Sequence, residues 1–199
     1  MKFYLTLVFA LNCIFAFPQD STSKNKIYVK EFDWQIVIPK GYDTVSSKYM
    51  NNLEAKGKEM IEETINKKIE NNTKTLFTFR RTAFNFLESN FQNFDEKVDG
   101  NYKESCNYAY NILYESFKKQ KPEAQVDSSF GIEIFDNITF YRFLLKIQLE
   151  NGVVMNMYMF NHLFEKKDLT ISVIYVSIMD GVLLLESLRK SKFNFSLKQ

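Results

Sequence analysis

The chain is poor in the residues that carry most metal and enzyme chemistry. It has one histidine, two cysteines, six glycines and three prolines among 199 residues. A zinc site needs several Cys or His ligands, and a Ser-His-Asp or Cys-His site needs an imidazole beside its nucleophile. A phosphate-binding loop needs a glycine-rich run, which the sequence lacks. We therefore expect no metal and no cofactor, and His162 is the single imidazole that any catalysis could use.

Excess charge is also missing. The formal net charge is +2, without the basic stripe that is typical of nucleic-acid-binding domains. The 45% hydrophobic content and the length predict one domain with a core large enough to need no disulfides. Nucleic acid is therefore not an expected partner, and a monomer is expected.

The amino-terminal segment has the pattern of an export signal. Lys2 precedes the apolar run from Phe3 to Ala16, which is shorter than the roughly 20 residues that span a bilayer. We predict a signal peptide over 1–16, a flexible leader over 17–26 and a single domain over 27–199, in a periplasmic or extracellular protein without a transmembrane segment. The alternatives are a lipid anchor at Cys13, whose preceding Leu11 and Asn12 fit poorly, or a buried terminal element. Cleavage after Ala16 leaves only Cys106, so no internal disulfide is expected.

The stretch from Ile132 to Phe195 is the best-patterned part of the chain. Apolar residues alternate with polar ones before and after Asp136-Asn137, which predicts two strands joined by a two-residue turn. That register places Ile132 beside Tyr141 and Phe130 beside Phe143, on one core face. The whole stretch is expected to form a sheet closed by a final helix.

The turn that contains Glu150-Asn151-Gly152 allows two registers. A two-residue loop would scatter the apolar side chains over both faces of the sheet. A three-residue loop with Gly152 in the left-handed conformation pairs apolar side chains throughout, so we predict a bulge at Gly152. The predicted pairs are Leu149 with Val153, Ile147 with Met155, Leu145 with Met157 and Phe143 with Met159.

The remaining periodicities complete the order strand, helix, two strands, helix, four strands, helix. The expected elements are strands over 32–38, 75–81, 84–91 and 169–178, and helices from Ser46 or Ser47 to about Ile69, from Tyr102 to Lys118, and after a capping Asp180. This order predicts an α+β fold, namely a three-layer α/β/α sandwich with a mostly antiparallel sheet of about seven strands and three helices.

Two segments at the ends of the domain, with this element order, resemble the PsbP-like fold. They are the first strand, Trp34-x-Ile36-x-Ile38-Pro39, and the last helix, Leu184-Leu185-x-x-Leu188-x-x-Ser191-x-Phe193. More closely, the chain looks like small exported bacterial proteins with that fold and no established activity. The family includes photosystem II extrinsic subunits and a nuclear-import factor that binds a small GTPase. The resemblance implies binding to another protein rather than catalysis. Metal sites proposed for photosynthetic members have no evident counterpart here.

One face of the central hairpin carries a mixed polar and aromatic set. The predicted register places Arg142, Lys146, Tyr158 and His162 on the face opposite the methionines. We interpret these four residues as a candidate protein-binding surface. The alternative is that a helix, the one after Asp99 or the one after Ser46, covers Tyr158 and Phe160.

A hydrolase is the competing functional class. It would use a carboxylate in a cleft, with Glu133 or Glu165 as candidates, although no second acid stands at a recognisable spacing. A deep pocket with converging acids would favour the hydrolase, whereas a shallow sheet face would favour the binding module.

Overall fold

The computed structural model of the protein describes residues 25–45, 58–68, 72–149 and 151–194. Its strands are β1 (Lys26–Val29), β2 (Trp34–Val37), β3 (Asp43–Thr44), β4 (Lys74–Thr82), β5 (Asn85–Asn93), β6 (Gln125–Phe135), β7 (Ile138–Gln148), β8 (Val154–Phe164), β9 (Lys167–Tyr175) and β10 (Lys192–Phe193). Its helices are α2 (Glu96–Asp99), α3 (Tyr102–Gln120) and α4 (Ile178–Arg189), and residues 58–65 are also helical. The predicted signal peptide, most of the leader and Cys13 lie outside the described residues.

The strands form two antiparallel sheets. The large sheet has seven strands in the order β3-β4-β5-β9-β8-β7-β6, and the small sheet has three in the order β1-β2-β10. All described strand pairs are antiparallel. The protein is therefore a mixed α+β fold with a mostly antiparallel sheet, as predicted. The strand around Trp34 is the exception, because it belongs to the small sheet and β3 takes the seventh place in the large one.

Both predicted hairpin registers are confirmed. Ile132 pairs with Tyr141 across a turn in which Asp136 and Asn137 have φ values of 46° and 64°. Across the next turn Ile147 pairs with Met155 and Phe143 with Met159. Gly152 has a φ of 78°, and the Leu149 nitrogen donates to the Val153 carbonyl at 2.9 Å. A left-handed glycine at this place is what a three-residue loop requires.

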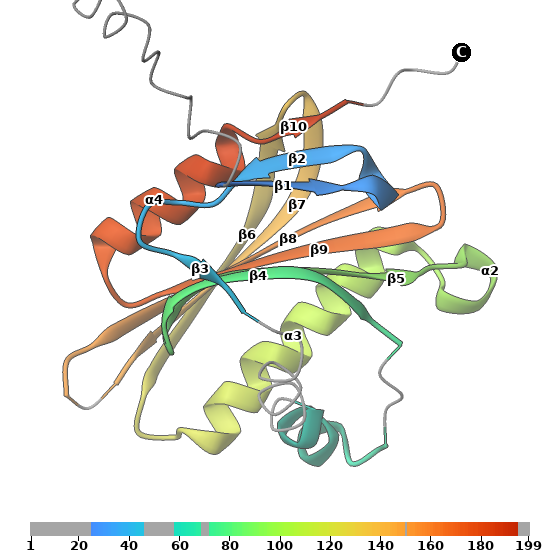
Figure 1. Ribbon diagram of the computed structural model, residues 1–199. Helices are drawn as coiled ribbons and strands as arrows, with labels where there is room; N and C mark the ends of the chain where they lie inside the picture. Colours follow the sequence, from blue (N-terminus) through green and yellow to red (C-terminus); the bar gives the residue numbers. More distant parts are fainter. Residues whose placement is uncertain (1–24, 46–57, 69–71, 150, 195–199) are drawn as a thin grey trace, which may run out of the picture.

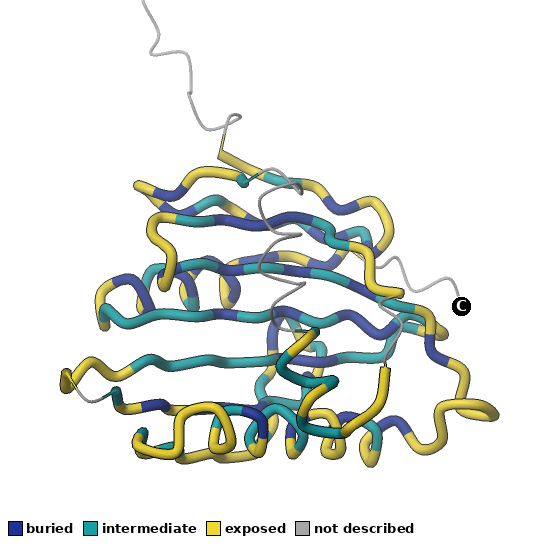
Figure 2. The backbone as a smooth tube through the Cα atoms, turned by 90° about the horizontal axis from the view of Figure 1, so that it is seen from below, coloured by how far each residue is buried: buried dark blue, intermediate teal, exposed yellow. Residues whose placement is uncertain are grey.

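The two faces of the large sheet have separate cores (Figures 1 and 2). Helix α3 packs Tyr102, Cys106 and Tyr110 against the odd-numbered residues of β7, such as Phe143. Helix α4 and the small sheet pack against the other face, where Trp34, Phe160 and Leu184 are fully or almost fully buried. In Figure 2 the strands carry much of the dark blue, and yellow is concentrated at turns and on the outer sides of the helices.

Several predicted helix ends are wrong. The first helix ends at residue 65 rather than near Ile69, because Asn66 takes a positive φ of 52°. The cap of α4 is Ser177, whose side chain accepts a hydrogen bond from the Asp180 nitrogen. The Asp180 carboxylate is buried instead and accepts hydrogen bonds from Tyr42 and Arg81, both at 3.0 Å. Short-range pattern places a helix better than it places its ends.

Candidate functional site

The four residues predicted as a binding surface lie on one face of the β7–β8 pair. Arg142 pairs with Phe160 and Lys146 pairs with Asn156, as the register predicts. Phe160 is almost fully buried, and it is covered from the side of α4 and the small sheet, not by α3. Along the strands, Lys146 therefore lies on one side of the Arg142–Phe160 pair and His162 lies on the other.

The rings of Tyr158 and His162 pack against other aromatic rings and do not form an open surface. The ring of Tyr158 stacks on Phe160 and Tyr175, with centroid distances of 5.7 and 6.2 Å. His162 is half-buried, and its ring lies edge-on to Phe164 at 4.3 Å. Its Nδ1 lies 2.7 Å from the Thr139 carbonyl, which can only accept, so Nδ1 carries the proton. Burial lowers the pKa of His162. These observations indicate a neutral packing histidine.

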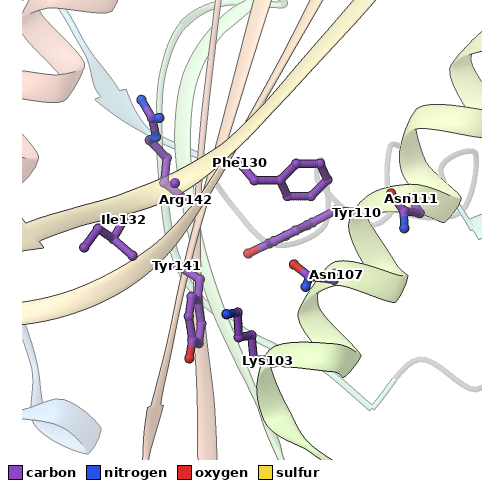
Figure 3. A pocket seen from close by; sticks show the side chains of 9 residues that line it. Lys103, Asn107, Tyr110, Asn111, Phe130, Ile132, Tyr141 and Arg142 are labelled. Atoms are coloured by element: carbon purple, nitrogen blue, oxygen red, sulfur yellow. The ribbon is translucent and has the colours of Figure 1, made fainter.

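An open groove of about 520 Å³ runs between strand β6 and helix α3 (Figure 3). We call it the edge groove. Its helix wall is the polar row Lys103, Asn107 and Asn111, spaced four residues apart and so on one side of α3. Its sheet wall includes Phe130 and Ile132. Polar side chains of the helix face apolar side chains of the strand across the groove and do not pack against them. The helix therefore leaves this part of the sheet uncovered.

Strand β6 is the free edge of the large sheet, and three of its apolar side chains are exposed. Phe130, Ile132 and Ile134 are 49%, 62% and 61% exposed. The predicted register placed these three residues on a face of the sheet that was expected to be buried. The face is correct, but the side chains are exposed. The half-exposed ring of Phe130 still packs against the core, since it lies 5.2 Å from the ring of Phe143 and 5.9 Å from that of Tyr110.

Arg142 extends past the edge groove on the opposite side of the strands (Figure 3). Its guanidinium lies so close to Gly131 that a Cβ there would come within 2.6 Å of a guanidinium nitrogen. Its Nε is buried without a hydrogen-bond partner in the described part of the chain. Neither Arg142 nor Lys103 forms an ion pair with any described residue. Two basic side chains with no described counter-ion thus flank the exposed edge.

A second cavity of about 300 Å³ lies beneath α3, and it is lined mainly by polar side chains. We call it the polar pocket. Its main residues are Tyr102, Cys106 and Tyr110 of α3, Asn161 of β8, and Asp168 and Thr170 of β9. Tyr102 donates to Asp168 Oδ1 and Tyr110 donates to Asn161 Oδ1, both at 2.7 Å. Burial raises the pKa values of both tyrosines, so their hydroxyls stay protonated donors.

Sequence reasoning missed the polar pocket. Tyr102 and Cys106 read as part of an apolar helix stripe, and Asp168 stood just outside the predicted strand. One signal was present: the inward row Met155, Met157, Met159 continues to Asn161, where a polar residue interrupts the apolar alternation. Burial raises the pKa of the Cys106 thiol to about 11, so it is a neutral thiol and a poor nucleophile.

The carboxylates considered for a hydrolase lie elsewhere. Glu133 pairs with Arg189 at 3.4 Å, and Glu165 is exposed in the β8–β9 turn with a φ of 54°. Neither lines the edge groove or the polar pocket. Within the described ranges, no group of three or more His, Cys, Asp or Glu residues is placed to hold a metal ion. No described helix has both the length and the apolar character that crossing a membrane requires.

Comparisons with known proteins place the fold but not a family. No family model and no curated protein matches the chain. A solved structure does match: the solution structure of cyanobacterial PsbP (CyanoP) from Synechocystis sp. PCC 6803, with a TM-score of 0.53 and 9% identity. The match covers 84% of this chain and 91% of that one. At this identity the likeness shows the fold alone, and that fold is PsbP-like.

Proposed function

We propose that this chain is an exported, non-catalytic binding module that captures an extended segment of another protein along strand β6. The observation that carries the proposal is an 11-residue edge strand with exposed Phe130, Ile132 and Ile134 beside an open groove. Edge strands in soluble proteins are usually shortened, charged or covered, because an unpaired strand recruits another chain. The domain around it is proposed to be a three-layer α/β/α sandwich, which holds this edge rigid.

The chemistry of the edge defines the segment it fits. A strand added to β6 gains backbone hydrogen bonds, and its alternate side chains reach the two faces of the sheet. Apolar residues would cover Ile132 and Ile134 on the α3 side. An acidic residue on that side would meet Lys103, and one on the other side would meet Arg142. The occupant is therefore an extended segment with alternate apolar residues and acidic residues between or beside them.

The proposal retains Arg142 from the predicted surface and assigns no contact to Tyr158 or His162, which are packed. Lys146 is exposed and lies opposite Asp127 of β6, farther along the same edge. It would extend the contact for a longer segment. The hydrolase alternative has no supporting observation, because its candidate acids lie outside both cavities.

The test uses a photoreactive residue at position 132 of the full chain, expressed in the native host, and maps the crosslinked peptide by mass spectrometry. We expect one extended segment of another protein with the pattern described above. A synthetic peptide of that segment should shift the backbone amide NMR signals of β6. The double variant I132K/I134K should weaken its binding by at least about tenfold, because two charges would be buried in an apolar contact.

The matched control is I178K, since Ile178 is 82% exposed at the start of α4 and does not line the edge groove. It should leave binding unchanged. Equal loss with I178K would overturn the proposal, as would peptide-induced shifts that leave the amides of β6 unchanged. A crosslink found only between two copies of this chain would replace the partner with self-association.

A further inference from the structure

The polar pocket contains a buried carboxylate without a described counter-ion. Asp168 is 7% exposed, and it forms no ion pair with any described residue. Its described partners are neutral: the Tyr102 hydroxyl at 2.7 Å and the amides of Asn161 and Gln92, both at 3.3 Å. A buried charge is costly unless it is paired or well hydrogen-bonded.

The hydrogen bonds around Asp168 are unevenly distributed. Oδ1 accepts from Tyr102 and Asn161, whereas Oδ2 accepts a single bond from the described residues, a long one from Gln92 at 3.3 Å. A carboxylate oxygen has two lone pairs, so Oδ2 has room for a further donor. The same neutral network holds the carboxylate in place, because Asn161 is itself fixed by Thr170 Oγ1 at 2.7 Å and by Tyr110.

The rest of the pocket also favours a cationic occupant. Among its described lining residues, Asp168 is the one acidic side chain, and no Lys, Arg or His is present. Phe94, Ala109 and Met159 supply an apolar wall. The volume of about 300 Å³ is at the small end of the range for ligand sites.

We propose that the polar pocket binds a small organic cation with an ammonium group, which donates to Oδ2 of Asp168 while its hydrocarbon part lies against Phe94 and Met159. This site is separate from strand β6, so it stands independently of the proposed function. Anions are disfavoured by Asp168, and neutral alcohols lose the charge-assisted bond.

The experiment titrates the full chain with three probes that share a phenethyl group: phenethylamine, phenethyl alcohol and 3-phenylpropionate. Binding is followed by calorimetry and by amide NMR shifts of β8 and β9. We expect phenethylamine to bind and the other two to bind at least about tenfold more weakly, the difference between a charge-assisted and a neutral hydrogen bond.

The variant D168N keeps an acceptor for Tyr102 but removes the charge, and it should weaken phenethylamine binding by about ten- to a hundredfold. The control D43N removes an exposed carboxylate on β3 and should change nothing. If D168N does not fold, S172L serves instead, because it fills the pocket from β9 and should abolish binding with Asp168 intact.

Three results would overturn the proposal. One is equal affinity for the amine and the alcohol, which would show that charge has no role. Another is preferential binding of 3-phenylpropionate. The third is no binding of phenethylamine to the folded wild-type chain at millimolar concentration.

Discussion

Oδ2 of Asp136 accepts a hydrogen bond of 2.8 Å from the backbone nitrogen of Phe193. Oδ1 of the same carboxylate accepts from Lys192 Nζ at 2.7 Å. A residue that shapes the β6–β7 turn thus also holds the last described strand, 57 positions later in the chain. Both hydrogen bonds lower the pKa of the Asp136 carboxyl, and the one from Lys192 has the larger effect.

Asp136 should therefore stabilise the fold in two separable ways. Asn tolerates a positive φ and can still accept from Phe193, so D136N should cost only about 0.5–1 kcal/mol, the value of a partly exposed ion pair. D136G also fits the turn but loses both bonds, and should cost about 1–3 kcal/mol. Urea unfolding at pH 7 measures both. Because the folded pKa is lowered, the charge contribution is present above the unfolded value and is lost as the pH falls through the folded one. Equal costs for both variants would contradict this division.

His162 should make the protein less stable in mild acid. Its folded pKa lies below the ordinary value of 6.5, because burial disfavours the imidazolium. The unfolded chain then binds more protons between the two pKa values, so stability falls as the pH drops below about 6.5. H162Q should remove this dependence between pH 7.5 and 5.5. NMR titration of the single histidine measures the pKa directly, and a value above 6.5 would contradict the prediction.

On the sheet face toward α3, truncating a side chain should destabilise the fold by very different amounts at different positions. Phe143 is fully buried, so F143A should cost about 3–5 kcal/mol. Ile134 lies on the same face of the neighbouring strand but is mostly exposed, so I134A should change stability by less than about 0.5 kcal/mol. Thermal or urea unfolding compares the two. A large cost for I134A would mean that β6 is covered.

Gly181 in α4 should resist the usual helix-stabilising substitution. An alanine Cβ there would lie 2.6 Å from the ring of Tyr175. Overpacking of this kind costs about 1–3 kcal/mol, more than the gain of about 1 kcal/mol in helix propensity. G181A should therefore destabilise the wild type. In a Y175L background the clash is gone and the same substitution should stabilise. A double-mutant cycle tests the coupling, and purely additive effects would argue against the contact.

Local pattern was sufficient where one strand follows another along the chain. Gly152 and the alternation around it predicted the register of β7 and β8, because a slip of one residue would have exposed the core face. The same pattern assigned Ile132 and Ile134 to a face but could not show that they lie uncovered. Whether these side chains are buried depends on how far α3 extends over β6. That extent is limited by the polar row of α3 that includes Asn107, which lies in a distant part of the sequence.

Non-local pairing explains the remaining differences. The strand around Trp34 was predicted to belong to the main sheet. The alternation of apolar and polar residues in that strand does not identify the strands it pairs with, which are β1 and β10. No role for Asn161 and Asp168 was predicted from the sequence, because the tyrosines of α3 that donate hydrogen bonds to them are more than 50 positions away. Polar residues in a strand predict exposure unless such distant donors are known.

The small sheet brings the two ends of the domain together. Strand β2 pairs with β1 on one side and with Phe193 of β10 on the other, and the rings of Trp34 and Phe193 stack at 5.1 Å. A ribosome makes Trp34 long before Phe193, so the growing chain keeps this stacking surface open until residue 193 emerges. The small sheet can therefore be completed only after residue 193 has been made, however early β1 and β2 form.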